Sequence, residues 1–173
     1  DPASYPASSV ACSGTHDTEP AIAWWERATE DERQRVLAIP SVQRYAAGEL
    51  SAAQFSPALR DVLIEALIAS GSDLCLMPIQ DVFGWRDRIN EPATVTPENW
   101  SWHLPWPCDT LGDQPAAAER QQALRRWSAV HGRLAGSQGL LIVKVDGFGG
   151  PLRKHLGRGF AEHRFAVDAK KFF

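Results

Sequence analysis

Two short apolar segments, separated by a stretch with helical periodicity, limit the fold of this chain more than any other feature. Residues 9–13 are small and apolar, and residues 73–79 are almost continuously apolar. Strands of this composition are typical of a parallel sheet that is buried on both faces. Two parallel strands need a long crossover connection, which is usually helical. The sequence therefore predicts an α/β protein built on a strand–helix–strand unit.

The clearest helix of this crossover should begin at Ser56-Pro57, because Ser is a favoured N-cap and Pro suits the first helical turn. Gly71 is its expected C-cap, and residues 41–55 should contain only short helical pieces. The apolar residues of the helix recur at intervals of three and four and therefore share one face: Leu59, Val62, Leu63, Ala66 and Leu67.

Two shorter helices are expected nearer the N-terminus. The first should cover about 20–27, with Thr18 as its N-cap. The second should cover about 29–38, because Thr29 and Glu32 have the spacing of a capping box. With these helices, the crossover between the two predicted strands is largely helical.

The chain changes character after the second strand. Residues 80–111 show no periodicity and contain four tryptophans, and a loop of this length inside a domain is usually functional. Residues 140–145 could form a further strand. A helix is expected over 115–133, with four apolar residues on one face: Ala123, Leu124, Trp127 and Val130.

Charge divides the chain into two parts. Residues 138–173 carry seven basic and three acidic side chains, a net charge of +4, whereas the whole chain carries −3. We therefore treat 1–137 as one unit and 138–173 as a basic tail of unknown structure. A net +4 over this length is weak for nucleic-acid binding, so a solvated or disordered tail is expected and no nucleic-acid partner.

Composition is that of a soluble globular protein, with 44% hydrophobic and 23% charged residues in 173. No apolar run is long enough to span a membrane and no signal-peptide pattern is visible, so no membrane partner and a cytoplasmic location are expected. Three scattered cysteines favour reduced thiols, and the five histidines lack paired ligand spacing, so no metal site is predicted. Because the chain starts at Asp1 and its single methionine is Met77, an excerpt or a cleaved piece is expected.

Two acidic dipeptides follow the two predicted strands directly. His16-Asp17 comes after the first, and Gln80-Asp81 comes after the second. In barrel enzymes, polar residues at the carboxyl ends of strands face the active site, and a carboxylate there can bind sugar hydroxyls. Two alternatives remain open: Asp17 could cap the following helix, and Asp81 could form a turn.

The long loop mixes aromatic rings with amide groups. Tryptophan faces stack on the C–H faces of sugars, so such a loop suits a carbohydrate surface, although tryptophans also fill cores. A well-packed irregular loop is the alternative. The residues concerned are Asn90, Pro92, Thr94, Asn99, Trp100 and Trp102.

Three segments together resemble the C-terminal part of the 4-α-glucanotransferases, also called amylomaltases or disproportionating enzymes. They are residues 13–25 (SGTHDTEPAIAWW), 73–84 (DLCLMPIQDVFG) and 88–102 (RINEPATVTPENWSW). The family has a Gly-Thr-His-Asp motif, then Pro-Leu/Ile/Val-Gln-Asp, then Met-Asn-x-Pro-Gly-Thr followed by Asn-Trp-x-Trp. Ile89 and Ala93 stand where the family usually has Met and Gly. The resemblance covers about residues 9–133.

The resemblance implies the C-terminal portion of a TIM (β/α)8 barrel, incomplete in this chain. The family transfers α-1,4-glucan segments between maltooligosaccharide donors and acceptors, with retention, through a covalent glucosyl-enzyme and without a cofactor. Asp17 and His16 match the third catalytic carboxylate and the histidine beside it. Asn90, Pro92 and Trp100 would border the acceptor side. Gln80 and Asp81 are also expected at the barrel mouth, as substrate contacts or as supports.

The family's nucleophile and acid/base lie on strands upstream of the Gly-Thr-His-Asp motif, where this chain has only 16 residues. We therefore expect the chain alone to be inactive. With only two barrel strands, it should also self-associate through unpaired strand edges. Two alternatives are a non-catalytic carbohydrate-binding or interaction module, and an inactive genomic remnant.

Overall fold

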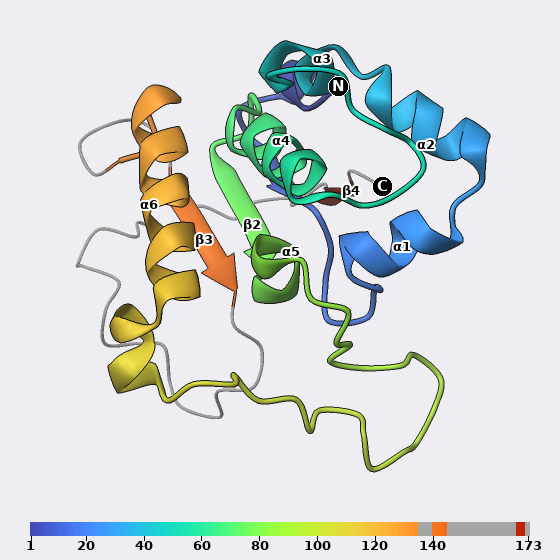
Figure 1. Ribbon diagram of the computed structural model, residues 1–173, viewed down its shortest axis with the longest axis vertical. Coiled ribbons are helices and arrows are strands. Elements are labelled where there is room, and N and C mark those ends of the chain that lie inside the picture. The colour runs from blue at the N-terminus through green and yellow to red at the C-terminus, as the bar shows by residue number, and fades with distance from the viewer. Residues whose placement is uncertain (135–139, 145–168, 172–173) are drawn as a thin grey trace.

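A parallel sheet of four strands, in the order β3-β2-β1-β4, lies at the centre of the computed structural model (Figure 1). The structure describes residues 1–134, 140–144 and 169–171. Val10 of β1 is opposite Leu74 of β2, and every neighbouring pair of strands is parallel. The predicted α/β class is therefore confirmed. The strands are β1 (Val10–Cys12), β2 (Leu74–Pro78), β3 (Leu140–Lys144) and β4 (Ala169–Lys171).

Helices make up most of the connection from β1 to β2 and part of the connection from β2 to β3. Thr29 forms the predicted capping box with Glu32, and the Ser56 hydroxyl accepts a hydrogen bond from the Leu59 N–H, as expected for an N-cap. The helices are η1 (Pro2–Ser4), α1 (Ala21–Arg27), α2 (Glu30–Leu37), α3 (Pro40–Tyr45), α4 (Pro57–Ile68), α5 (Ile79–Phe83), η2 (Cys108–Asp113) and α6 (Pro115–Val130).

The core lies between α4 and one face of the sheet. The apolar stripe of α4 is buried against Ala11 of β1 and against Cys75 and Met77 of β2, none of which is exposed. Helix α4 also contacts α3, α5 and α6. The same helical periodicity that predicted α4 therefore places it as the central helix of the layer that covers the sheet.

The opposite face of β2 is only partly covered. Exposure alternates along this strand: Cys75 and Met77 are buried, whereas Leu74, Leu76 and Pro78 are partly exposed. The prediction of a strand buried on both faces is therefore wrong for β2. A continuous apolar run predicts that both faces of a strand are buried, but burial of the second face also needs a second covering layer, which the run itself does not reveal.

Two local predictions also need correction. Thr18 does not cap α1; Pro20 is the N-cap residue, and the N–H of Ala21 donates to the Asp81 carboxylate instead. Helix α4 ends at Ile68, and its C-cap residue is Ala69 rather than Gly71. Gly71 is needed for another reason: a Cβ atom there would lie 2.2 Å from the Tyr5 carbonyl oxygen.

Helix α5 was not predicted, because five residues are too few to show periodicity; Gly84, with φ of 75°, ends it. Helix α6 stops at Val130 rather than 133, and Val130 is 70% exposed although Ala123 and Trp127 on the predicted apolar face are buried. The apolar stripe of α6 is therefore shorter than its sequence suggests.

The predicted tail contributes two strands to the sheet. Strand β3 pairs with β2 and strand β4 pairs with β1, so both N-terminal strands have neighbours on each side. The expectation that their edges are unpaired is therefore wrong. The remaining residues of the 138–173 tail lie outside the described residues. Within the described residues, no helix is long and apolar enough to cross a membrane.

Candidate functional site

The Gly-Thr-His-Asp segment forms a tight turn directly after β1. The Thr18 hydroxyl accepts a hydrogen bond from the Thr15 N–H (2.8 Å) and donates one to the Thr15 carbonyl (3.0 Å). Gly14 is required here because a Cβ atom would lie 2.6 Å from the Thr18 hydroxyl oxygen. The turn leaves the side chains of His16 and Asp17 35% and 50% exposed.

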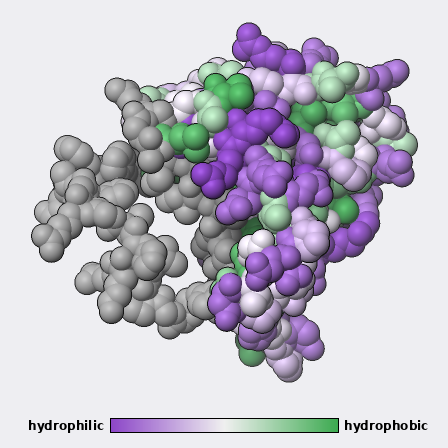
Figure 2. Space-filling view, turned by 60° about the vertical axis from the view of Figure 1, so that its left-hand side comes forward, coloured by the Kyte–Doolittle hydropathy of each residue, from purple (hydrophilic) through white to green (hydrophobic). Residues whose placement is uncertain are grey.

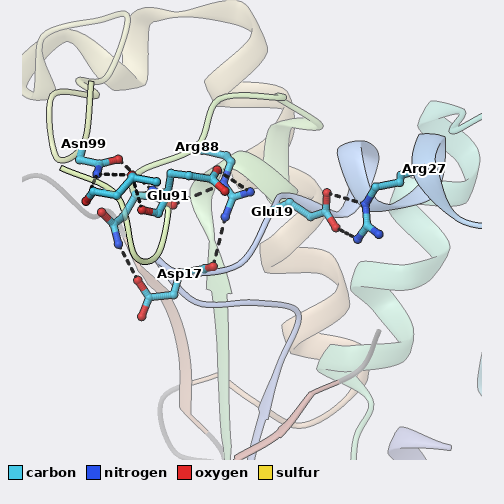
Figure 3. Close-up of polar contacts among 8 residues, drawn as sticks. Asp17, Glu19, Arg27, Arg88, Glu91 and Asn99 are labelled. Carbon is cyan, nitrogen blue, oxygen red and sulfur yellow. Dashed lines mark hydrogen bonds and ion pairs between the residues drawn. The ribbon is translucent and has the colours of Figure 1, made fainter. Parts of the chain in front are cut away.

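Two polar groups converge on the Asp17 carboxylate. The Asn90 amide donates to Oδ1 at 2.8 Å, and Nε2 of His16 lies 3.2 Å from Oδ2. Figure 3 shows the contacts that Asp17 makes with residues of the long loop. The alternative that Asp17 caps α1 is wrong, since its carboxylate faces the long loop and not the helix. Residues from the first and third motifs thus meet at one half-exposed carboxylate.

The exposed ring of Trp100 packs beside His16, which itself contacts this carboxylate. Its ring centre lies 5.0 Å from that of His16 at an angle of 43°, and the side chain is 58% exposed. The backbone of Trp100 has φ of 64°, a left-handed conformation that costs about 1–2 kcal/mol for a residue with a side chain. Its N–H donates to the Ile89 carbonyl at 2.7 Å. Backbone strain of this kind clusters at functional sites.

The loop segment between Asn90 and Trp100 is closed by its own side chains. Asn99 accepts a hydrogen bond from the Glu91 N–H (2.8 Å) and donates to the carbonyl and the hydroxyl of Thr94 (3.1 and 3.0 Å) (Figure 3). Pro92 lies exposed in this turn. Ala93 has φ of 61°, which explains why glycine suits this position in the related motif.

Four aromatic rings hold the two ends of the loop together. The ring centres of Phe83 and Trp85 are stacked 4.3 Å apart, and Trp85 also lies 5.9 Å from Trp102 and 5.7 Å from Trp106. All four side chains are partly exposed. We call Phe83, Trp85, Trp102 and Trp106 the aromatic cluster. It joins the start of the loop to its end, with Asn90 and Trp100 between them.

Gln80 and Asp81 lie under the site and not at its surface. Gln80 is 2% exposed, and its Nε2 has no hydrogen-bond partner in the described part of the chain. Asp81 accepts hydrogen bonds from the Ser13 hydroxyl (2.5 Å) and from the Ala21 N–H (2.7 Å). Burial raises the pKa of the Asp81 carboxyl, while these two donors act in the opposite direction. Asp81 joins the end of β1 to the start of α1.

Arg88 was not among the predicted site residues, since no motif or spacing singles it out. Its NH2 group donates to the Asp17 carbonyl and its Nε to the Asn90 carbonyl, both at 3.3 Å. Its NH1 group lies 2.9 Å from Oε2 of Glu91 (Figure 3). Arg88 therefore bridges the backbones of both residues that meet at the site.

The geometry defines an α/β protein whose polar site lies beyond the carboxyl ends of two parallel strands, the usual place for ligand sites in this class. Comparison with known proteins gives the family. A sequence model described as 4-alpha-glucanotransferase matches residues 1–109, and the chain belongs to that family.

Individual relatives agree with this assignment. The chain is 31% identical over 118 residues to a chloroplastic/amyloplastic 4-alpha-glucanotransferase of Oryza sativa subsp. japonica, covering 66% of this chain and 18% of the relative. It is 31% identical over 135 residues to the corresponding protein of Solanum tuberosum, covering 77% and 21%. The chain thus spans about a fifth of the length of these relatives.

A solved structure shows the same fold. Amylomaltase from Streptococcus agalactiae, determined in complex with acarbose, matches with a TM-score of 0.56 and 21% identity. The match covers 75% of this chain and 23% of the amylomaltase. At this identity the likeness concerns the fold alone.

Proposed function

We propose that this chain forms the part of a 4-alpha-glucanotransferase active site that holds the glucose unit at the point of cleavage. The observation that carries the proposal is the convergence of Asn90 and His16 on the half-exposed Asp17 carboxylate. The substrate class is an α-1,4-glucan or maltooligosaccharide, as donor and as acceptor. The family membership, and the acarbose bound by the related amylomaltase, support this choice.

The site can act on a sugar in two ways. Asp17 is ready to accept charge-assisted hydrogen bonds from sugar hydroxyls, and such bonds strengthen as positive charge develops on the ring in the transition state. The exposed ring of Trp100 offers a flat apolar surface to the C–H face of a neighbouring glucose unit. Asn90 and His16 would hold the carboxylate in the orientation that both contacts need.

The complete reaction requires groups beyond these. Retention needs one carboxylate that attacks the anomeric carbon and a second that protonates the leaving oxygen, about 5 Å apart. In the proposal both lie on barrel strands upstream of the Gly-Thr-His-Asp motif, so the chain alone binds sugar without turnover. The partly exposed face of β2 supports this proposal, because the interior face of a barrel strand stays uncovered when the rest of the barrel is absent. A cytoplasmic location stays a prediction.

Binding and turnover test the proposal separately. Maltoheptaose titrated into the chain should quench tryptophan fluorescence saturably, because Trp100 is exposed beside His16 of the site. Asp17→Asn should weaken this binding about tenfold, the loss expected when hydrogen bonds to a charged group are replaced by neutral ones. Asp31→Asn makes the same chemical change at an exposed position on α2 and should bind like the unmodified chain.

Incubation with maltotriose gives the second measurement. The expected result is no ladder of longer and shorter maltooligosaccharides. A ladder that disappears in Asp17→Asn would contradict the proposed inactivity of the isolated chain. Absence of saturable binding would contradict the proposed sugar site and favour the inactive remnant.

A further inference from the structure

We propose that Arg88 is a positioning residue that sets the separation between Asp17 and Asn90. The proposal rests on the sugar site described above and extends it to a residue that does not touch the substrate. Asp17 and Asn90 come from segments far apart in the sequence, and the hydrogen bond between their side chains forms only if both backbones are held in place. Arg88 contacts both backbones.

The contacts use all three nitrogen atoms of the guanidinium group. NH2 donates to the Asp17 carbonyl, Nε donates to the Asn90 carbonyl, and NH1 pairs with the Glu91 carboxylate. The group is planar and its donors have fixed relative directions. Two carbonyl oxygens that accept hydrogen bonds from the same rigid guanidinium group are held at a set distance from each other. The side chains of the same two residues, Asp17 and Asn90, are therefore held at a set separation as well.

An ordinary surface ion pair would not have this arrangement. Arg86, two residues earlier on the same loop, provides the contrast. Among the described residues, its guanidinium pairs with the Glu26 carboxylate alone, and both side chains are exposed. Arg88 is only partly exposed, and two of its three contacts are to backbone carbonyls of the site. Charge pairing explains the contact with Glu91 but not the contacts with Asp17 and Asn90.

A lysine could not replace Arg88 in this role. Its ammonium is a point charge without a planar set of donors. Arg88→Lys therefore keeps the charge and the pairing with Glu91 while it removes the geometric link between the two carbonyls. The matched change Arg86→Lys alters the same kind of side chain on the same loop, outside the site. Glu91→Gln removes only the ion pair and leaves the two carbonyl contacts.

The side-chain amide of Asn90 reports the positioning directly and without sugar. In a spectrum of the ¹⁵N-labelled chain, the Asn90 NH₂ signals, assigned by their loss in Asn90→Asp, should be shifted by the bond to Asp17. In Arg88→Lys they should move to the positions seen in Asp17→Ala. In Arg86→Lys and Glu91→Gln they should stay in place. Unmoved Asn90 signals in a folded Arg88→Lys variant would overturn the proposal, whatever the sugar measurements show.

Maltoheptaose binding gives the functional consequence. Arg88→Lys should weaken binding about tenfold, the effect of one lost charge-assisted hydrogen bond, while Arg86→Lys and Glu91→Gln should change it less than about twofold. Equal losses of maltoheptaose affinity in Arg88→Lys and Glu91→Gln would show that Arg88 acts only through its ion pair with Glu91, and would contradict the proposal. If the unmodified chain binds no maltoheptaose, the sugar site fails, and the Asn90 signals still decide the role of Arg88.

Discussion

Asp81 is a buried carboxylate that joins the end of β1, the start of α1 and helix α5. The Ser13 hydroxyl and the Ala21 N–H both donate to it, in the place where the sequence predicted a side-chain cap from Thr18. Burial raises its pKa above the ordinary value of 3.8. The folded protein therefore favours the protonated form more than the unfolded chain does.

This pKa shift makes stability depend on pH. Because the folded pKa lies above the unfolded one, the contribution of Asp81 is most favourable below the ordinary carboxyl pKa and declines as pH rises through the raised value. Asp81→Asn keeps an acceptor for Ala21 and a polar partner for Ser13 but cannot ionise. Urea unfolding from about pH 4 to about pH 8 should show a smaller loss of stability in Asp81→Asn than in the unmodified chain.

Asp31→Asn is the control, because Asp31 is exposed in the first turn of α2. Its pH profile should follow that of the unmodified chain. If Asp81→Asn loses stability with rising pH as steeply as the unmodified chain, Asp81 is not the source of the dependence.

Motifs predicted some site residues and missed others for a physical reason. Asp17, Asn90 and Trp100 lie in recognisable motifs, and the structure brings them together. Arg88 acts on backbone carbonyls, which every residue has, so its role leaves no trace in the pattern of side chains. The capping of α1 by Asp81 depends on which strand lies beside the helix, and local sequence does not contain that information.

At the level of elements, the loop between α5 and η2 combines irregular backbone with a defined shape. Its ends meet in the aromatic cluster, where Trp85 contacts Phe83, Trp102 and Trp106. Aromatic pairs contribute about 0.5–1.5 kcal/mol each beyond the area that they bury. The cluster therefore offsets part of the entropy lost in ordering a long loop.

Trp85→Ala should loosen this loop. Removing the ring that contacts the other three should lower the free energy of unfolding by about 2 kcal/mol, the sum of a few aromatic pairs, and should speed proteolytic cleavage within residues 86–101. Urea unfolding and timed trypsin digestion measure the two effects.

Trp100→Ala gives the comparison, since its largely exposed ring contacts His16 rather than the cluster. It should reduce maltoheptaose binding and leave the stability nearly unchanged. Similar digestion rates for Trp85→Ala and the unmodified chain would show that the cluster does not hold the loop.

Elements with strong local signals were predicted well, and those without them were not. Capping residues located the start of α2 and α4 within one residue. Helix α5 has only five residues, too few to show helical periodicity. Strand β4 has three residues, and their sequence does not by itself predict a strand. Strand β3 was predicted from its apolar residues, but its pairing with β2 depends on the whole chain.

At the scale of the molecule, the sheet depends on residues distant in sequence. Removal of residues 135–173 would take away β3 and β4 and leave β1 and β2 with unpaired outer edges. Unpaired edges lower stability and favour association with other chains. On the face shown in Figure 2, hydrophilic residues predominate and hydrophobic ones reach the surface of the described part in small, separate patches. On this face, no broad apolar patch competes with the strand edges as a route of association.

A chain of residues 1–134 should melt at a lower temperature than the full chain and should form larger species as its concentration rises. Thermal unfolding and size-exclusion chromatography with light scattering measure both. A chain of residues 1–168, which lacks only β4, should lie between the two. Identical melting temperatures for all three chains would contradict the pairing of β3 and β4 with the sheet.

The pairing of β1 with β4 also affects when the protein can fold. Val10 pairs with Ala169, so β1 cannot form this pairing until the much later residues of β4 have been synthesised. During translation the chain emerges from the N-terminus onward at about 5–20 residues per second, and β1 leaves the ribosome many seconds before β4. The pairing of β1 with β4 can therefore form only after β4 has emerged, and contacts of such long sequence separation form slowly. Until then, the nascent chain presents the edge of β1 to whatever binds exposed strands, including chaperones.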